Sequence, residues 1–157
     1  KAVLPHMRQQ GAGWIVNIGS QDALPPRRPF GPHDREWGYH VYGAAKAALH
    51  RLTQGIAAEL LDDNIAVNMV GPSTAIRTPG ADTFIPAEFP TEDVEYLVET
   101  VMAMVRLPAT ERTGLLGFSM HFPYHHGIEV HGLDGRQAFP RKAPPDWSHP
   151  AIPASGE

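Results

Sequence analysis

Tyr42 and Lys46 are the two side chains whose types and spacing most directly indicate chemistry. They lie four positions apart in the segment VYGAAKAAL, so on a helix both leave the same face, one turn from each other. A tyrosine normally titrates at about pH 10, and an ammonium within about 4 to 6 Å favours its phenolate form. Such a pair can exchange a proton with an alcohol or carbonyl compound near neutral pH. The same spacing also occurs on solvated helix surfaces, so the surrounding sequence decides between the two interpretations.

Ser20 is a third candidate because of the segment that precedes it. The run from Trp14 to Ile18 is short, apolar and rich in β-branched residues, which is typical of a strand buried on both faces of a parallel sheet. Ligands of open α/β sheets bind at the carboxyl ends of the strands. A hydroxyl directly after such a strand is therefore placed to hydrogen-bond a substrate oxygen.

A helix and a second strand follow these residues. Apolar side chains recur at helical spacing over residues 43–61. A second face of this helix carries alanines, whose small side chains allow close packing. Residues 65–70 read as a second buried strand, which ends at Gly71-Pro72-Ser73. Strand, helix and strand in this order predict a crossover unit with parallel strands.

Flanking segments complete the predicted organisation. Lys1 to Arg8 reads as the last turns of a helix that stops at Gly11–Gly13, and a start within a helix indicates a piece of a longer protein. Four prolines between Gln21 and His40 predict a long loop. Thr91 is expected to cap a second helix, and residues 115–120 form a third strand. The buried stripe of that second helix is predicted to be Val94, Leu97, Val98, Val101 and Val105.

Composition narrows the functional classes. Hydrophobic residues make up 42% of the chain and charged residues 19%, which is typical of a globular protein. There is no cysteine, so thiolate chemistry and disulfides are excluded. A net charge of −4 with scattered cations argues against nucleic acid and membrane partners, and favours a small-molecule partner. Without an apolar span or a secretory signal we expect a cytoplasmic location.

The order of these features resembles the short-chain dehydrogenase/reductase family. The resemblance covers residues 1–135 and includes the segments LPHMRQQGAGWIVNIGS, VYGAAKAALHRLTQGIAAEL, NIAVNMVGPSTAIRT and ERTGLLGFSM. It implies an α/β fold, a Rossmann-type doubly wound parallel sheet, of which this chain would hold the C-terminal half of a single domain. It also implies hydride exchange between NAD or NADP and an alcohol or ketone/aldehyde, in a full-length parent that is a homo-oligomer.

Carried over by position, the resemblance implies a role for each motif residue. Tyr42 would be the catalytic acid/base, and Lys46 would favour its phenolate and hold the nicotinamide ribose. Ser20 would anchor the substrate oxygen. The loop after the second strand would line the nicotinamide through Pro72, Ser73, Thr74, Ile76 and Thr78. Ser73 stands where the family usually has glycine, and this loop is one residue longer.

Two further departures shape the prediction. The Gly-rich phosphate loop that the family places near its N-terminus is not among these residues, so we expect this chain alone to bind no dinucleotide and to be inactive. Tyr42 follows Ser20 by 22 positions, more than the family usually has, so residues 21–41 are an inserted loop that alters the substrate pocket. After residue 135, the Pro-rich segment 136–157 is expected to be extended or disordered.

Three alternatives stay open at this point. The chain could be a non-catalytic fragment that acts at most as an oligomerisation module through its alanine-rich helix. An epimerase or dehydratase of the extended branch of the superfamily would explain the long spacing from Ser20 to Tyr42. The histidines invite a metal site, but their spacing fits no standard ligand pattern, so no metal is expected; they are His121, His125, His126 and His131.

Overall fold

Three parallel strands form the sheet of this computed structural model, which describes residues 2–157. They are β1 (Gly13–Ile18), β2 (Ile65–Gly71) and β3 (Leu116–Phe118), hydrogen-bonded in the order β1-β2-β3. Every residue of β2 is buried, as expected for a central strand that is covered on both faces. The parallel sheet predicted from the two apolar runs is therefore present, and the third strand is shorter than predicted.

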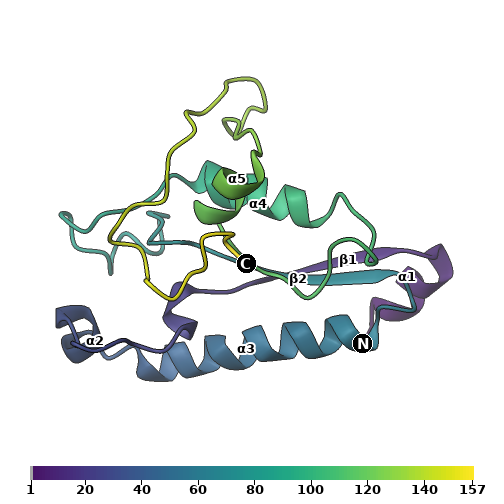
Figure 1. Ribbon diagram of the computed structural model, residues 1–157, viewed down its shortest axis with the longest axis horizontal. Coiled ribbons are helices and arrows are strands. Elements are labelled where there is room, and N and C mark those ends of the chain that lie inside the picture. The colour runs from purple at the N-terminus through teal and green to yellow at the C-terminus, as the bar shows by residue number, and fades with distance from the viewer. Residues whose placement is uncertain (1) are drawn as a thin grey trace.

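Helices cover both faces of this sheet (Figure 1). The long helix α3 (His40–Glu59) lies on one face, and α4 (Val94–Met104) and α5 (His121–His126) lie on the other. Both crossovers step in the same direction, from β1 to β2 and from β2 to β3, while their helices occupy opposite faces. The two crossovers therefore have opposite hands, and one departs from the right-handed form that such units nearly always adopt.

Each face of β2 carries its own core cluster. Toward α3, Ile65 and Val67 pack with Ala57 and Leu60. Toward α4 and α5, the cluster consists of Val70, Ala103, Met104 and Phe122. The alternation of side chains along a strand explains this division, because residues two apart point to the same face. The side of α3 that packs on the sheet therefore contacts odd-numbered residues of β2, such as Ile65 and Val67.

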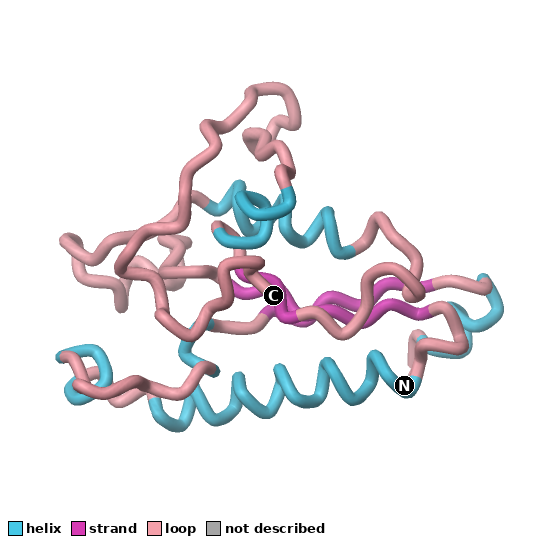
Figure 2. The backbone as a smooth tube through the Cα atoms, viewed as in Figure 1, coloured by secondary structure: helices cyan, strands magenta, loops and turns pink. Residues whose placement is uncertain are grey.

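The segment between β1 and α3 is less irregular than predicted. Figure 2 shows two short helical pieces within it: the 3₁₀ turn η1 (Gln21–Ala23) and the helix α2 (Pro32–Glu36). Proline is acceptable at the first helical position because its nitrogen has no partner to lose there, so Pro32 begins α2 rather than preventing it. The prolines correctly predicted that most of this segment is loop, but they gave no indication of α2.

The helix before β1 and the helix α3 both differ slightly from their predicted bounds. The first, α1, runs from Leu4 to Gln10 and ends at Gly11, which adopts a left-handed conformation with φ of 74°. This confirms the predicted glycine stop, whereas Lys1 lies outside the described residues. Helix α3 starts three residues before the predicted Gly43. Tyr42 therefore lies in its first turn.

Two predictions about α4 are wrong. Thr91 does not cap it: Asp93 precedes the helix, and Thr91 instead forms a bridge with Ala75 that keeps the chain extended. The buried positions are also different, since Val98 is 39% exposed. The buried side chains of α4 are Tyr96, Thr100, Ala103 and Met104.

Polar anchors explain this rotation of α4. The Thr100 hydroxyl reaches the Tyr96 and Ser119 carbonyls, and the Tyr96 hydroxyl donates to the Pro140 carbonyl at 2.7 Å. A stripe defined by hydrophobicity alone omits such contacts, so it missed Tyr96 and Thr100 and included the exposed Val98. Its members Leu97 and Val101 are partly buried and do pack against the core.

Residues from Pro140 onward contain no helix or strand; they pass the carboxyl ends of the strands and turn in toward the sheet at the C-terminus (Figure 1). Ile152 is 8% exposed and packs against Met69 and Phe118. The Gly156 carbonyl accepts from the Phe118 backbone N–H at 2.8 Å, which anchors the end of the tail at β3.

None of the helices within residues 2–157 combines the length and apolar character needed to span a bilayer.

Candidate active site

Tyr42 and Lys46 lie together at the carboxyl end of β1. The Lys46 ammonium is 5.7 Å from the centre of the Tyr42 ring and donates to the Ile18 carbonyl at 2.9 Å. That hydrogen bond ties the ammonium to the last residue of β1. Tyr42 is 45% exposed, so its hydroxyl is within reach of a ligand. The structure thus brings the two residues into the proximity that their spacing predicts.

Ser20 follows β1 by two residues, at the predicted edge of the sheet, and is buried. Its hydroxyl oxygen accepts a hydrogen bond from the Asp22 backbone N–H at 3.1 Å and so caps the η1 turn. A longer contact of 3.5 Å leads from this hydroxyl to an Asp22 carboxylate oxygen. Within the described part of the chain, no hydrogen bond joins Ser20 to Tyr42. The sequence predicted the position of Ser20 at the sheet edge, but not that its hydroxyl would contact Asp22.

His50 extends the row on α3, and sequence reasoning missed it. It lies one turn beyond Lys46, is buried, and its Nε2 accepts a long, 3.5 Å contact from the Ser20 backbone N–H. Burial, with a smaller contribution from the Lys46 charge, lowers the pKa of His50, which agrees with an unprotonated Nε2. The spacing Tyr-x-x-x-Lys-x-x-x-His was the available signal, since all three residues share one helix face.

Two side chains of the loop after β2 that were predicted to line the cofactor, Ser73 and Thr74, point into the protein interior. Ser73 has no exposed surface, and its hydroxyl lies 2.9 Å from His121 Nδ1. Thr74 is 3% exposed and donates through its hydroxyl to Glu92 at 3.1 Å. Further along the loop, Ile76 is half-buried and Thr78 is exposed. The roles of these residues, and that of the half-buried Pro72, stay predictions.

A buried polar cluster results, defined here as Ser73, Thr74, Glu92, Ser119 and His121. Glu92 is its centre: one carboxylate oxygen accepts from the Ser119 hydroxyl and the other from the Thr74 backbone and hydroxyl. Burial raises the pKa of Glu92 to about 7, although these hydrogen bonds act in the opposite direction. The cluster joins the loop after β2 to β3 and to the start of α4, and nothing in the local sequence indicated it.

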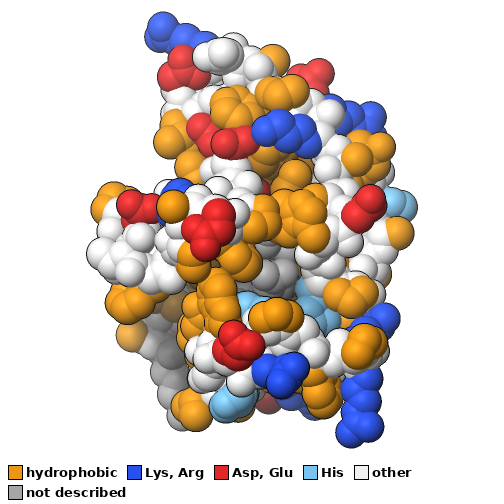
Figure 3. Space-filling model, turned by 90° about the vertical axis from the view of Figure 1, so that its left-hand side faces the viewer, with side chains coloured by type: hydrophobic (Ala, Val, Ile, Leu, Met, Phe, Trp, Pro, Cys, Tyr) orange, Lys and Arg blue, Asp and Glu red, His pale blue; other side chains and the backbone are white. Residues whose placement is uncertain are grey.

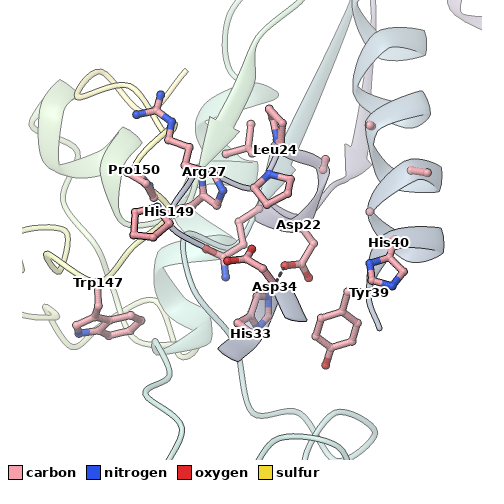
Figure 4. A pocket seen from close by; sticks show the side chains of 18 of the residues that line it. Asp22, Leu24, Arg27, His33, Asp34, Tyr39, His40, Trp147, His149 and Pro150 are labelled. Carbon is pink, nitrogen blue, oxygen red and sulfur yellow. Dashed lines mark hydrogen bonds and ion pairs between the residues drawn. The ribbon is translucent and has the colours of Figure 1, made fainter. Parts of the chain in front are cut away.

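A cavity of about 680 Å³, called here the α3 cavity, opens beside the first turns of α3. Figure 3 shows this end of the molecule hollowed, with hydrophobic and histidine side chains around the depression. Figure 4 shows side chains of the 21–41 segment facing Trp147 and His149 of the tail across it. Gly43 and Ala47 supply the α3 side of the wall. The 21–41 segment therefore supplies much of the wall of a cavity that reaches residues on either side of Tyr42.

An ion pair joins the two ends of the part of the 21–41 segment that lies between η1 and α2. His33 Nε2 lies 3.2 Å from an Asp22 carboxylate oxygen, and this hydrogen bond raises the pKa of His33. The His33 ring also packs against Trp37 and Tyr39, with ring centres 5.2 and 5.3 Å away. Asp22 thus contacts both Ser20 and the cavity wall.

Metal ligands do not cluster in the part of the chain that the structure describes. Among residues 2–157 no group of three or more His, Asp or Glu side chains could hold an ion. His131 instead pairs with Glu99 at 3.1 Å, and the rings of His125 and His126 pack edge to face.

Comparisons with known proteins agree with this geometry. The family model for short chain dehydrogenases matches residues 1–84, which is more than half of the chain. Dehydrogenase/reductase SDR family member 4 of Bos taurus is 38% identical over 78 residues, covering 50% of this chain and 24% of the relative. L-xylulose reductase of Caenorhabditis elegans is 41% identical over 76 residues, covering 48% and 27%.

Solved structures extend the likeness beyond the matched sequence. The crystal structure of acetoin dehydrogenase from Enterobacter cloacae is 30% identical, with a TM-score of 0.56 over 74% of this chain and 46% of that one. The chain spans less than half the length of each of these relatives. Sequence match, parallel sheet and the order of Ser20, Tyr42 and Lys46 lead to one conclusion: this chain belongs to the short-chain dehydrogenase family.

Proposed function

We propose that the protein to which this chain belongs is an NAD(P)-dependent oxidoreductase that interconverts an alcohol and a ketone or aldehyde. The observation that carries the proposal is the position of Lys46, fixed by the Ile18 carbonyl at the end of β1 and 5.7 Å from the Tyr42 ring. The relatives named for L-xylulose reduction and acetoin dehydrogenation support the same reaction class.

The residues present fit the nicotinamide end of such a cofactor. Lys46 uses one of its three N–H donors on the Ile18 carbonyl, which leaves two for ribose hydroxyls. The exposed Tyr42 hydroxyl lies on the same helix face. When bound, the nicotinamide would supply the position that accepts or donates the hydride.

Proton movement is assigned to Tyr42. In alcohol oxidation, its phenolate takes the hydroxyl proton while the carbon-bound hydrogen leaves as hydride; in reduction, the Tyr42 hydroxyl returns a proton to the carbonyl oxygen. Ser20 would hold the substrate oxygen, since its O–H has only the long contact to Asp22.

The 157-residue chain alone is expected to be inactive. The matched residues make up less than half of each relative, and the Gly-rich loop that the family uses for the dinucleotide phosphates is not among residues 1–157. We therefore expect no NAD(P)H binding by this chain in a fluorescence titration; tight binding would contradict this part of the proposal.

Activity tests the reaction class. A protein that joins this chain to its dinucleotide-binding half should oxidise secondary alcohols with NAD⁺ or NADP⁺, followed as the appearance of NAD(P)H. Ser20→Ala should lower kcat while leaving cofactor affinity unchanged, because the hydroxyl acts on the substrate oxygen. Absence of turnover with a broad panel of alcohols and ketones would overturn the proposal.

An oligomerisation module without catalysis is the second candidate. Two apolar side chains of α3 point to solvent: Val41 is 81% exposed and Leu52 is 55% exposed. Exposed apolar surface on a helix often marks an interface. A concentration-dependent dimer in sedimentation analysis, weakened by Leu52→Lys, together with no turnover in any context would favour this candidate. The same face would serve a homo-oligomer of the full-length protein.

A further inference from the structure

The α3 cavity has the size of a small-molecule site. Its volume of about 680 Å³ lies within the range of roughly 300 to 1,000 Å³ that is common for ligand pockets. A four-carbon alcohol would leave most of this space unfilled, because complementary packing requires close contact on all sides. The cavity therefore fits a bulkier compound.

The lining of the α3 cavity is mainly apolar. The inserted segment, residues 89–90 and the tail contribute an aliphatic side chain, five prolines and two aromatic rings, namely Leu24, Pro25, Pro26, Pro29, Pro90, Pro150, Phe89 and Trp147. Aromatic rings and proline faces bury large areas against flat, ring-shaped ligands with little loss of side-chain freedom. This favours a ligand that contains rings.

Both acidic groups of the lining are engaged within the protein. Asp22 pairs with His33 at 3.2 Å, and Asp34 accepts from the Gly31 backbone N–H at 2.9 Å. Arg27 is exposed and lies on the side of His149, at the edge of the group in Figure 4. An uncharged ligand avoids the cost of moving a charge from water into this apolar lining.

Tyr42 lies beside the cavity, between two residues that line it. Tyr39 lines the cavity, and its ring centre is 6.2 Å from that of Tyr42. Gly43, the next residue of α3, also lines it. A compound whose rings fill the cavity can therefore hold an attached alcohol or carbonyl group beside the Tyr42 hydroxyl.

We propose that the α3 cavity binds a bulky, uncharged, ring-containing alcohol or carbonyl compound, whose oxygen it directs toward Tyr42. The identity of the reacting group rests on the proposed function, but binding by the cavity does not. The site depends on the 21–41 segment and on Trp147, and neither belongs to the Ser20, Tyr42 and Lys46 motif.

Calorimetry on the 157-residue chain tests binding without turnover. The probes are 2-acetylnaphthalene, its anionic analogue 6-acetyl-2-naphthoate, and acetoin. We expect the uncharged naphthyl ketone to bind at least about tenfold more tightly than the other two. Ala44→Phe, which places a ring in the cavity mouth, should weaken its binding by at least about tenfold. The matched control is Ala45→Phe, one residue along α3, exposed and outside the lining.

Ala47→Leu is a milder second variant, in case Ala44→Phe disturbs folding. The midpoint of thermal unfolding of Ala44→Phe and of Ala47→Leu should equal that of the control Ala45→Phe. Equal affinity for the three probes, or unchanged binding in both Ala44→Phe and Ala47→Leu, would overturn the cavity proposal. Cavity binding without turnover in the extended protein would instead overturn the proposed function alone. Turnover of small alcohols without naphthyl ketone binding would overturn the cavity proposal alone.

Discussion

Two groups of polar residues lie near the carboxyl end of the sheet, and they are built in opposite ways. Tyr42 and Lys46 lie on one turn of one helix, and Tyr42 remains 45% exposed. The buried polar cluster joins the loop after β2, the start of α4 and the end of β3, and each of its members is at most 7% exposed. Tyr42 and Lys46 keep hydrogen-bond donors available for ligands. The donors of the buried polar cluster instead bond to other members of the cluster and hold the chain segments together.

This difference in hydrogen-bond partners predicts which group matters for activity and which for stability. Groups that wait for a ligand have few partners in the protein, so removing them should cost activity and little folding free energy. Groups that satisfy one another inside the protein leave an unpaired, buried partner when one is removed, which costs stability. The predictions below contrast the two groups, from the largest expected change in unfolding free energy to the smallest.

Glu92 should make stability depend on pH. Its folded pKa of about 7 exceeds the ordinary 4.5, so the folded protein holds a proton that the unfolded chain releases. Its contribution is fully present below pH 4.5 and is lost as the pH rises through about 7. The difference in unfolding free energy between the native protein and Glu92→Gln should change by roughly 3 kcal/mol between these limits.

Urea unfolding at stepped pH values measures this difference. The pKa values of His50 and His121 are lowered by burial, so their contribution has the opposite sign: it is present above the ordinary pKa of 6.5 and is lost on acidification. Both proteins carry these histidines, so their effect cancels in the difference. Parallel stability curves for the two proteins would show that the pKa of Glu92 is the same in the folded and unfolded states, which would contradict the prediction.

Gly43→Ala should destabilise the junction between η1 and α3. A Cβ at Gly43 would lie 2.5 Å from the Asp22 carbonyl oxygen, so η1 would have to move, at a cost of about 1 to 3 kcal/mol. The control lies on the same helix: at Gly55 the nearest atom to a new Cβ is the end of the Arg51 side chain, 3.5 Å away. Gly55→Ala should stabilise by about 0.5 to 1 kcal/mol. Thermal unfolding should show opposite signs, and equal signs would refute the close approach.

Lys46→Met should change stability least, by less than about 0.5 kcal/mol, because its hydrogen bond to Ile18 is exposed. Ser119→Ala, by contrast, removes the hydroxyl that contacts Glu92 and the Ser73 backbone, and should cost about 2 kcal/mol. Chemical denaturation of both variants checks the contrast. A loss for Lys46→Met as large as that for Ser119→Ala would mean that Lys46 is structural.

The same contrast explains what could be predicted from the sequence. Tyr42 and Lys46 were found because a helix fixes the relation of residues four apart, and β1 and β2 because an apolar run between turn residues has few other uses. Glu92 was not found, since its partners Thr74 and Ser119 come together only after two crossovers. The buried face of α4 was predicted only in part for the same reason. Leu97 and Val101 pack against the core as expected, but distant polar contacts also bury Tyr96 and Thr100.

Residues 21–41 show a further limit. Their prolines and the long spacing to Tyr42 indicated an insertion, but not that Asp22 and His33 would pair across it or that Trp147 would close a cavity from more than a hundred residues away. Such closure depends on packing between segments that carry no shared local pattern.

The most direct test of the proposed proton transfer is Tyr42→Phe in the protein that joins this chain to its dinucleotide-binding half. At saturating cofactor and alcohol, kcat should fall by about 10² to 10⁴, since the phenyl ring cannot accept the proton. Cofactor affinity, measured by fluorescence titration, should change by less than about threefold, because Lys46 and the cofactor-binding half remain. A kcat within twofold of the native protein's, roughly 0.4 kcal/mol in activation free energy, would contradict the assignment of Tyr42 as the acid/base.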